Sequence, residues 1–162
     1  MHSQKSIWFT ITVAACLVAC KKEQVGKTGD SIAAIPVTIQ NAMAFRPDPT
    51  VSTSKSAGGA IQIILSIPAG TGRSIKEITK VAANTSYTQI QATGTTGLYT
   101  STPIAVNSTT ATFNTTLAEY VVKAAGTIPA SNNELAKRFY FLLTLDNGST
   151  IVTTAVRVLV LD

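Results

Sequence analysis

The chain from Ile35 to Asp162 alternates between short apolar segments and turn-forming residues. Thr, Val and Ile are frequent, and Gly, Pro, Asn or Ser interrupt them at intervals of about 8 to 15 residues, a spacing typical of all-β sandwiches and barrels. We therefore predict an antiparallel β-sandwich. The expected strands are Ile35–Asn41, Ala60–Ile67, Ser74–Ala83, Tyr87–Ala92, Leu98–Val106, Thr110–Asn114, Arg138–Leu145 and Thr150–Leu161.

The strongest strand pattern lies at the end of the chain. Alternate positions from Phe139 to Leu145 carry Phe or Leu, and Asp146-Asn147-Gly148 follows as a turn, because Asn and Gly tolerate the positive φ of tight hairpins. In the returning strand, alternate positions from Val156 to Val160 carry Val. Both strands are apolar on nearly both faces, which predicts central strands, or a second face covered by another element such as the helix that we expect over Leu117–Ala124.

One helix is expected within this β pattern, over Leu117–Ala124. Thr116 and Glu119 form a capping box, and the apolar residues that follow have the i, i+3, i+4, i+7 spacing of one helix face. Gly126 is expected to end the helix. We expect the Tyr120 ring to pack in the core rather than to serve as a ligand platform.

Two further segments need a choice between structures. In Ser74–Asn84, Ser74 and Glu77 form a capping-box pattern for a helix, whereas the β-branched residues favour a strand, which we prefer. The segment Phe45–Pro49 contains two prolines, which remove two donors from a β-ladder. We therefore expect it to be a loop or an edge strand.

Residues 1–19 have the layout of an export signal. A basic residue, Lys5, precedes an apolar run from Ile7 to Ala19, and this run is too short to span a bilayer. Small residues precede Cys20, as a signal peptidase requires, and polar sequence begins directly after it. The alternative is an ordinary cleaved signal with Val13-Ala14-Ala15 as its recognition triplet.

The motif Leu17-Val18-Ala19-Cys20 resembles the lipobox of bacterial lipoproteins. The resemblance implies that Cys20 receives a diacylglyceryl group and becomes the new N-terminus. Two or more acyl chains hold a protein stably at a bilayer, whereas one gives marginal binding. Cys16 is the alternative lipidation site, but we prefer Cys20 because Leu17 lies at the apolar position before it. Lys21 in place of an acidic residue implies, by the same resemblance, release from the inner membrane and a location in the outer membrane.

Residues 20–34 are polar and contain glycine, which predicts a flexible tether. Lys21-Lys22-Glu23 is similar to the lysine-plus-acidic signal that sends lipoproteins of the Bacteroidota phylum to the cell surface, although it has only one acidic residue. Asp30-Ser31-Ile32 is similar to the O-glycosylation acceptor of that phylum, which implies a glycan on Ser31. A linker turn is the alternative interpretation of this tripeptide.

The final hairpin carries a second resemblance. From Phe139-Tyr140-Phe141 through Asp146-Asn147-Gly148 to Val156-Arg157-Val158, it resembles the last hairpin of the immunoglobulin-like domains in many Bacteroidota lipoproteins. The resemblance implies an immunoglobulin-like antiparallel β-sandwich with one short helix over residues 35–162. This domain would follow the signal peptide, 1–19, and the lipidated cysteine with its tether, 20–34.

Composition narrows the chemistry. A chain of 162 residues with 45% hydrophobic and 13% charged residues suits one domain behind a leader. The formal net charge is +5, but the basic residues form no cluster interleaved with aromatics, so we expect no nucleic-acid partner. Loss of the leader removes the only histidine, His2, and Cys16. Because zinc sites need Cys or His ligands and a Ser or Cys nucleophile needs a His base, we expect no metal, cofactor or catalytic residue.

Carboxylates are the remaining common catalytic groups, as in glycoside hydrolysis. Each has a simpler role: Glu77 and Glu119 fit caps or exposed strand positions, Glu134 lies in a polar loop, Asp146 starts a turn, and Asp48 lies between prolines. A calcium site at the Asp146 turn would need several more acidic ligands. A carboxylate-dependent hydrolase is therefore our third hypothesis.

We rank two other functions above a hydrolase. The first is a non-enzymatic structural or accessory module of the cell envelope, held in the membrane by its lipid anchor. The second is a module that binds a glycan or an envelope protein through loops at one end of the sandwich. Tyr99, in Gly97-Leu98-Tyr99, is the best candidate for a ligand contact, and strand packing is the alternative role for its ring.

Overall fold

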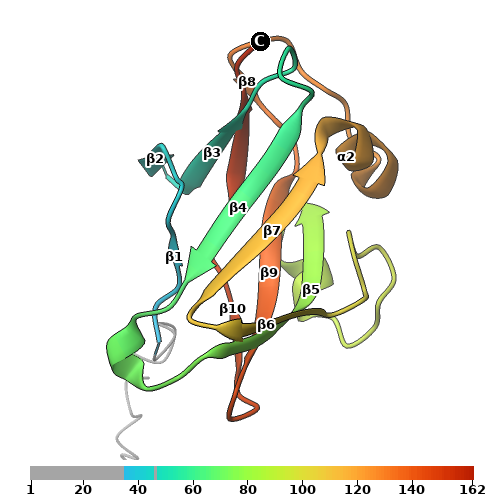
Figure 1. Ribbon diagram of the computed structural model, residues 1–162. Helices are drawn as coiled ribbons and strands as arrows, with labels where there is room; N and C mark the ends of the chain where they lie inside the picture. The colour runs from blue at the N-terminus through green and yellow to red at the C-terminus, as the bar shows by residue number, and fades with distance from the viewer. Residues whose placement is uncertain (1–34, 46) are drawn as a thin grey trace, which may run out of the picture. The chain divides into compact units, whose positions relative to one another are not determined.

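The computed structural model describes residues 35–45 and 47–162 (Figure 1). This part of the chain is mainly β, as predicted. Two helices, α1 (Thr88–Gln91) and α2 (Leu117–Ala124), and a 3-10 turn, η1 (Ala69–Thr71), accompany the strands. The strands are β1 (Thr38–Ile39), β2 (Ala44–Phe45), β3 (Pro49–Thr53), β4 (Ala60–Ser66), β5 (Ile75–Asn84), β6 (Ile104–Ser108), β7 (Thr110–Thr116), β8 (Asn133–Glu134), β9 (Arg138–Leu145), β10 (Thr150–Val152) and β11 (Arg157–Val160).

The described strands form three sheets, with the orders β1-β4-β7, β10-β9-β5-β6 and β2-β3-β11-β8. All pairings are antiparallel except that of β3 with β11, which is parallel. In Figure 1, β4 and β7 lie in front, and β7 crosses over β9. Buried side chains of both sheets belong to one core. Phe113 from β7 packs edge-on against Phe141 from β9, with ring centroids 5.4 Å apart.

Three of the expected strands are confirmed, and so is the alternation predicted for one of them, β9. Strand β9 has the predicted bounds, β7 extends two residues past its predicted end, and β4 ends one residue before the predicted Ile67. Phe139, Phe141, Leu143 and Leu145 are all buried in the main core. Pleating points successive side chains to opposite faces of a sheet, so the alternation placed this face of β9 correctly.

Strand β5 confirms the strand interpretation of the segment Ser74–Asn84, and its pairing contains two irregularities. Its pairing with β9 shifts register between Ile75 and Glu77 and again between Ile78 and Lys80. Each β-bulge inserts one extra residue, so buried residues three apart, Ile75, Ile78 and Val81, all face the core. A spacing of three resembles a helix in the sequence, but here the bulges produce it.

The returning strand at the end of the chain is interrupted, contrary to the prediction of one strand over Thr150–Leu161. β10 pairs with β9, and β11 instead pairs with β3 in another sheet. Between them, the Thr153 hydroxyl accepts the Phe141 N–H at 3.3 Å, in place of a backbone carbonyl, and Val156 forms an isolated bridge to Phe139. The side-chain acceptor lets the backbone leave the ladder, and strands that switch sheets commonly do so at such irregularities.

The predicted strand Tyr87–Ala92 is wrong, because this segment contains the four-residue helix α1. Ile90 of α1 packs with Tyr140, Ala82 and Ala155 on the outer face of the sheet that contains β9. The expectation that the Leu117–Ala124 helix covers this face is also wrong, since α2 packs into the main core.

Helix α2 has the predicted bounds. The Thr116 hydroxyl accepts the Glu119 N–H at 3.1 Å, as the capping box requires, and Tyr120 is fully buried. The predicted role of Gly126 needs correction. Ala125 adopts the left-handed conformation that ends the helix, with φ 46°, and Gly126 is needed because a Cβ there would lie 2.3 Å from the Tyr120 ring.

The remaining boundaries differ from expectation where strands are short. Of Ile35–Asn41, only β1 is a strand, and of Leu98–Val106 only the end belongs to β6, after Thr100 makes an isolated bridge to Val81. The prediction that Phe45–Pro49 is a loop or an edge strand is confirmed for Phe45, which lies in the edge strand β2. It is wrong for Pro49, which belongs to the inner strand β3, but as its first residue, a position where proline is tolerated.

Candidate functional site

The predicted attachment residues lie outside the described part of the chain. These are the lipidation site Cys20, the lipobox residues Leu17, Val18 and Ala19, and the glycosylation candidate Ser31. Two clusters of polar side chains do lie in the described part, one around Tyr99 and the other around Arg157.

The Tyr99 ring is packed between the sheets. Only 5% of the residue is exposed, and its ring lies edge-on to Phe139 and Phe113, with centroids 5.2 and 6.0 Å away. Burial raises the pKa of its hydroxyl above the ordinary value. A glycan platform needs an exposed ring face, so this geometry favours the packing role of Tyr99 over a ligand contact.

The Tyr99 hydroxyl begins a chain of hydrogen bonds that leads to helix α2. It lies 2.5 Å from the Thr115 hydroxyl, which donates to Glu119 at 2.7 Å, and Glu119 also accepts from Lys123 at 2.9 Å. Because the Thr115 proton goes to Glu119, Tyr99 is the donor to Thr115. These bonds, first that from Thr115 and then that from Lys123, lower the pKa of Glu119. The chain joins β7, α2 and the segment before β6.

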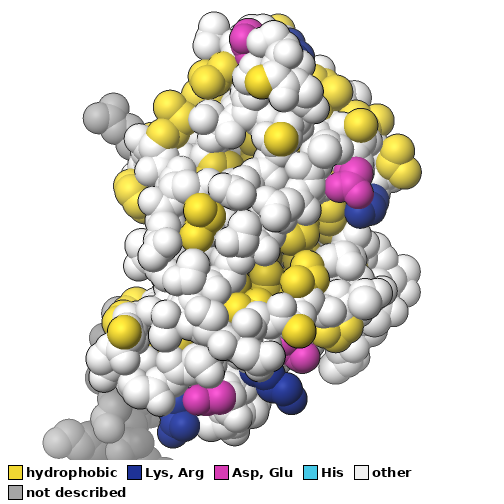
Figure 2. All heavy atoms as spheres, in the orientation of Figure 1, with side chains coloured by type: hydrophobic (Ala, Val, Ile, Leu, Met, Phe, Trp, Pro, Cys, Tyr) yellow, Lys and Arg dark blue, Asp and Glu magenta, His cyan; other side chains and the backbone are white. Residues whose placement is uncertain are grey.

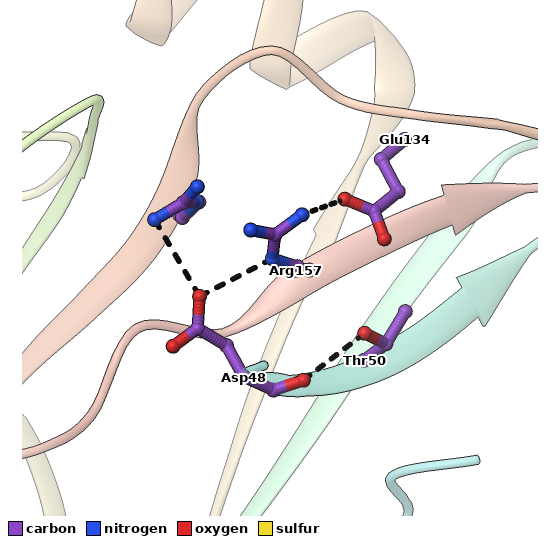
Figure 3. Close-up of polar contacts among 5 residues, drawn as sticks. Asp48, Thr50, Glu134 and Arg157 are labelled. Carbon is purple, nitrogen blue, oxygen red and sulfur yellow. Dashed lines mark hydrogen bonds and ion pairs between the residues drawn. The ribbon is translucent and has the colours of Figure 1, made fainter. Parts of the chain in front are cut away.

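The second cluster surrounds Arg157 of β11 and is drawn in Figure 3. Its Nε lies 3.2 Å from a carboxylate oxygen of Asp48, and its Nη1 donates to Glu134 of β8. Arg138 of β9 approaches the same Asp48 oxygen to 3.5 Å. The Arg157 side chain is 18% exposed, and the hydrogen bonds to Glu134 and Asp48 raise its pKa.

Sequence reasoning placed Asp48 and Glu134 in loops and missed their common partner. Asp48 lies 109 residues from Arg157, and Glu134 lies 23 residues from it. No local pattern links positions so far apart. The pairing follows from the parallel contact of β11 with β3 and its antiparallel contact with β8, which bring the two carboxylates to opposite sides of one guanidinium.

Both clusters have the chemistry of structural connections. In each, the carboxylates are neutralised by Lys or Arg, and the bonded groups come from different elements. In residues 35–45 and 47–162, no group of three or more His, Cys, Asp or Glu residues could hold a metal ion. No helix in the described part is long and apolar enough to cross a membrane.

The sequence matches no protein-family model, and neither the curated proteins nor the solved structures contain a match to it.

Proposed function

We propose that the chain is a lipid-anchored, non-enzymatic module of the bacterial cell envelope, with a structural or accessory role in the outer membrane. The observation that carries this proposal is the motif Leu17-Val18-Ala19-Cys20 at the end of an apolar leader. A polar tether and a β domain follow it, which is the order expected of a surface lipoprotein.

The arrangement of the described carboxylates supports a structural role. Asp48 and Glu134 join separate strands through Arg157, Glu119 joins α2 to β7, and Asp146 lies 3.8 Å from Arg73. Carboxylates that catalyse hydrolysis face a substrate cleft at a set distance from each other. Here these four carboxylates each contact a cation instead, and Glu77 accepts a hydrogen bond from the Thr79 hydroxyl at 3.3 Å.

The strand order supports an immunoglobulin-like form of the sandwich, which we include in the proposal. The order β10-β9-β5-β6 corresponds to G-F-C-C′ of such domains, and β1-β4-β7 corresponds to A-B-E. In addition, the last strand of the chain, β11, pairs in parallel with β3, which lies near the start of the described residues. Inter-strand nuclear Overhauser effects between Val51 and Val158 would test this pairing in solution, and their absence would contradict it.

Metabolic labelling with an alkyne fatty acid tests the anchor. We expect the wild-type chain and Cys16→Ala to carry the label in the outer-membrane fraction, and Cys20→Ala to lose it. The assignment is wrong if Cys20→Ala stays labelled while Cys16→Ala does not. Label in neither the wild type nor either variant would contradict lipidation itself.

Protein binding is the second candidate function, because two large apolar side chains that lie two residues apart in sequence are solvent-exposed. Phe45 is 63% exposed and Met43 57% exposed, at the β2 edge of a sheet. Exposed large apolar residues of this kind mark interaction sites when they are grouped. A pull-down from envelope extract with wild type and with Phe45→Ser, accompanied by a glycan array, would separate this function from a purely structural one.

A further inference from the structure

The free edge of β7 has an unusual composition. Among the described strands, β7 is an edge of the sheet β1-β4-β7, because it pairs only with β4. Its seven residues include no charged residue, proline or glycine. Natural edge strands are usually protected by Lys, Pro, bulges or shortness, and a long unprotected edge pairs readily with another strand.

The hydrogen bonds to β4 determine which backbone groups face this edge. The N–H of Leu117 donates to Gly59, and Thr109 accepts from Ile67, so the odd-numbered residues of β7 form the hydrogen-bonded pairs with β4. In an antiparallel ladder such pairs alternate with pairs whose N–H and C=O groups point away. Thr110, Thr112, Asn114 and Thr116 therefore direct their backbone groups to the free edge.

Not all of these groups are available. The Thr110 N–H already donates to the Ser108 hydroxyl at 3.3 Å, and the Thr116 C=O accepts the first bond of helix α2 as its N-cap. In the described part of the chain, no bond involves the N–H or C=O of Thr112 or Asn114, and both residues are exposed. Along the free edge, Thr110 therefore offers only its C=O group, Thr112 and Asn114 offer both N–H and C=O, and Thr116 offers only its N–H group.

This distribution is self-complementary. When a second copy of β7 pairs antiparallel about Phe113, Thr112 of each copy lies opposite Asn114 of the other, and both exchange two bonds. Thr116 then lies opposite Thr110, where the free N–H of one meets the free C=O of the other. The two groups already satisfied within the chain, Thr110 N–H and Thr116 C=O, also face each other. Isologous contacts of two-fold dimers need this kind of match.

Charge favours the same surface. The chain has a formal net charge of +5, so two copies repel each other over most approaches. Figure 2 shows that the surface over β4 and β7 is uncharged, with Lys, Arg, Asp and Glu only towards its margins. The outward residues of β4, which are Ala60, Gln62, Ile64 and Ser66, are also neutral.

We propose that the β7 edge joins two copies of this chain in an antiparallel dimer, which makes one continuous sheet of order β1-β4-β7-β7-β4-β1. The pairing is centred on Phe113. It gives the chain a means of self-association that uses main-chain bonds and leaves the Arg157 cluster, which lies on other strands, untouched.

Disulfide trapping of the full-length chain in cells tests the pairing. In a hydrogen-bonded antiparallel pair the Cα atoms lie about 5.5 Å apart, within the range of roughly 4.4–6.8 Å that a disulfide spans. Cells that express Thr112→Cys and Asn114→Cys together should therefore give a disulfide-linked dimer after addition of an oxidant. Each variant alone should give a several-fold weaker band, because equal positions are diagonal neighbours about 7–8 Å apart.

Two controls complete the trapping experiment. The unsubstituted chain reports linkage through Cys16 or Cys20, and Thr112→Cys with Gln62→Cys places the second thiol on the central strand β4, where no link should form. Equal links in all pairs, or no link in the Thr112 and Asn114 pair, would overturn the proposal. A link from β7 to a different protein would also overturn it, since the edge would then take a foreign strand.

Sedimentation equilibrium of the full-length chain in density-matched detergent gives an independent measurement. We expect a dimer for wild type and for Gln62→Lys, and loss of the dimer for Thr112→Lys, because two lysines would meet across the edge. Both positions are exposed on the same face, so the charge change is matched. A monomeric wild type, or equal behaviour of the two variants, contradicts edge pairing.

Discussion

Strand β9 has one face in the main core and the other under helix α1, and the two faces differ in their neighbours more than in their burial. Phe141 on the inward face is fully buried, and Tyr140 on the outward face is 1% exposed. Phe141 packs against Phe113 of the facing sheet, among residues of nearly every strand. Tyr140 packs in a small cluster with Ala82, Ile90 and Ala155, beside the Tyr87 ring at 4.6 Å.

The comparison teaches that a side chain's exposed fraction does not measure how much stability depends on it. Side chains on the inward face pack between two sheets, and the strands of each sheet are joined by hydrogen bonds. The outward face is covered by a helix of four residues, which is too short to be stable without its contacts. A cavity under α1 can therefore collapse more readily than one between the sheets, and collapse lowers the cost of a truncation.

Phe141→Ala should have the largest effect of the changes considered. Truncation leaves a cavity between two sheets, and we expect a loss of about 3–5 kcal/mol in the free energy of unfolding. Urea melts of the wild type and the variant measure it. A loss smaller than that of Tyr140→Ala would mean that the faces of β9 have the opposite importance.

Tyr140→Ala should cost less, about 2–3 kcal/mol, because Ala82 and Ala155 are small and α1 can move into the space. The same urea melts give the value. Hydrogen exchange should show faster opening of α1 in this variant and unchanged protection of β4 and β7. An equal loss of protection in α1, β4 and β7 would contradict this prediction, because it would show that the cluster around Tyr140 unfolds together with the main core.

Gly126→Ala tests how tightly the inward core is closed at its α2 end. The added Cβ would lie 2.3 Å from Cε1 and 2.6 Å from Cζ of the buried Tyr120 ring, so the ring must shift. We expect a loss of about 1–3 kcal/mol from overpacking, measured by urea melts. Gly70→Ala would be the control for the loss of a glycine, since no atom lies within 4 Å of its Cβ position and its φ is not positive. An effect no larger than that control would contradict close packing.

Ala125→Gly should stabilise the protein, in contrast to the three preceding substitutions. Ala125 has φ 46°, and the left-handed conformation costs a residue with a Cβ roughly 1–2 kcal/mol, part of which is offset by the greater entropy of glycine in the unfolded chain. We expect a net gain of a few tenths of a kcal/mol to about 1 kcal/mol in thermal unfolding. Ala124→Gly, in the helix itself, should instead destabilise the protein.

Glu119→Gln should have the smallest effect, and one that depends on pH. The pKa of Glu119 is lowered in the folded protein, so its bonds to Thr115 and Lys123 contribute stability above the unfolded pKa, about 4.3, and lose it as the pH falls through the folded value. The stability difference between wild type and Glu119→Gln should therefore be constant near neutrality and shrink in acid. Urea melts across this pH range check it, and a difference that grows in acid would contradict the network.

The amino-acid sequence determined the features that depend on neighbours a few residues apart. Alternation identified the inward face of β9, because the pleat fixes the face of every second residue. The capping box and the helical spacing gave the exact bounds of α2, because those bonds close within one turn. The proposed lipidation at Cys20 also rests on contiguous residues alone.

Only the tertiary structure decided the features that depend on distant pairing. Local sequence allowed Tyr87–Ala92 to be a strand, but the outer face of the β9 sheet required a cover, and α1 supplies it. The bulges in β5 and the interruption after Val152 follow from the partners of these strands, which periodicity does not specify.

The polar clusters and the free edge of β7 also depend on pairing between distant segments. Arg157 meets Asp48 and Glu134 because β11 lies between β3 and β8, and no spacing in the sequence contains that order. The sequence predicted a strand at Thr110–Asn114, but a strand has two edges, and only the pairing of β7 with β4 decides which backbone groups remain free. Periodicity fixes the face of a residue locally, whereas the partner of a backbone group is set by chain segments far away in sequence.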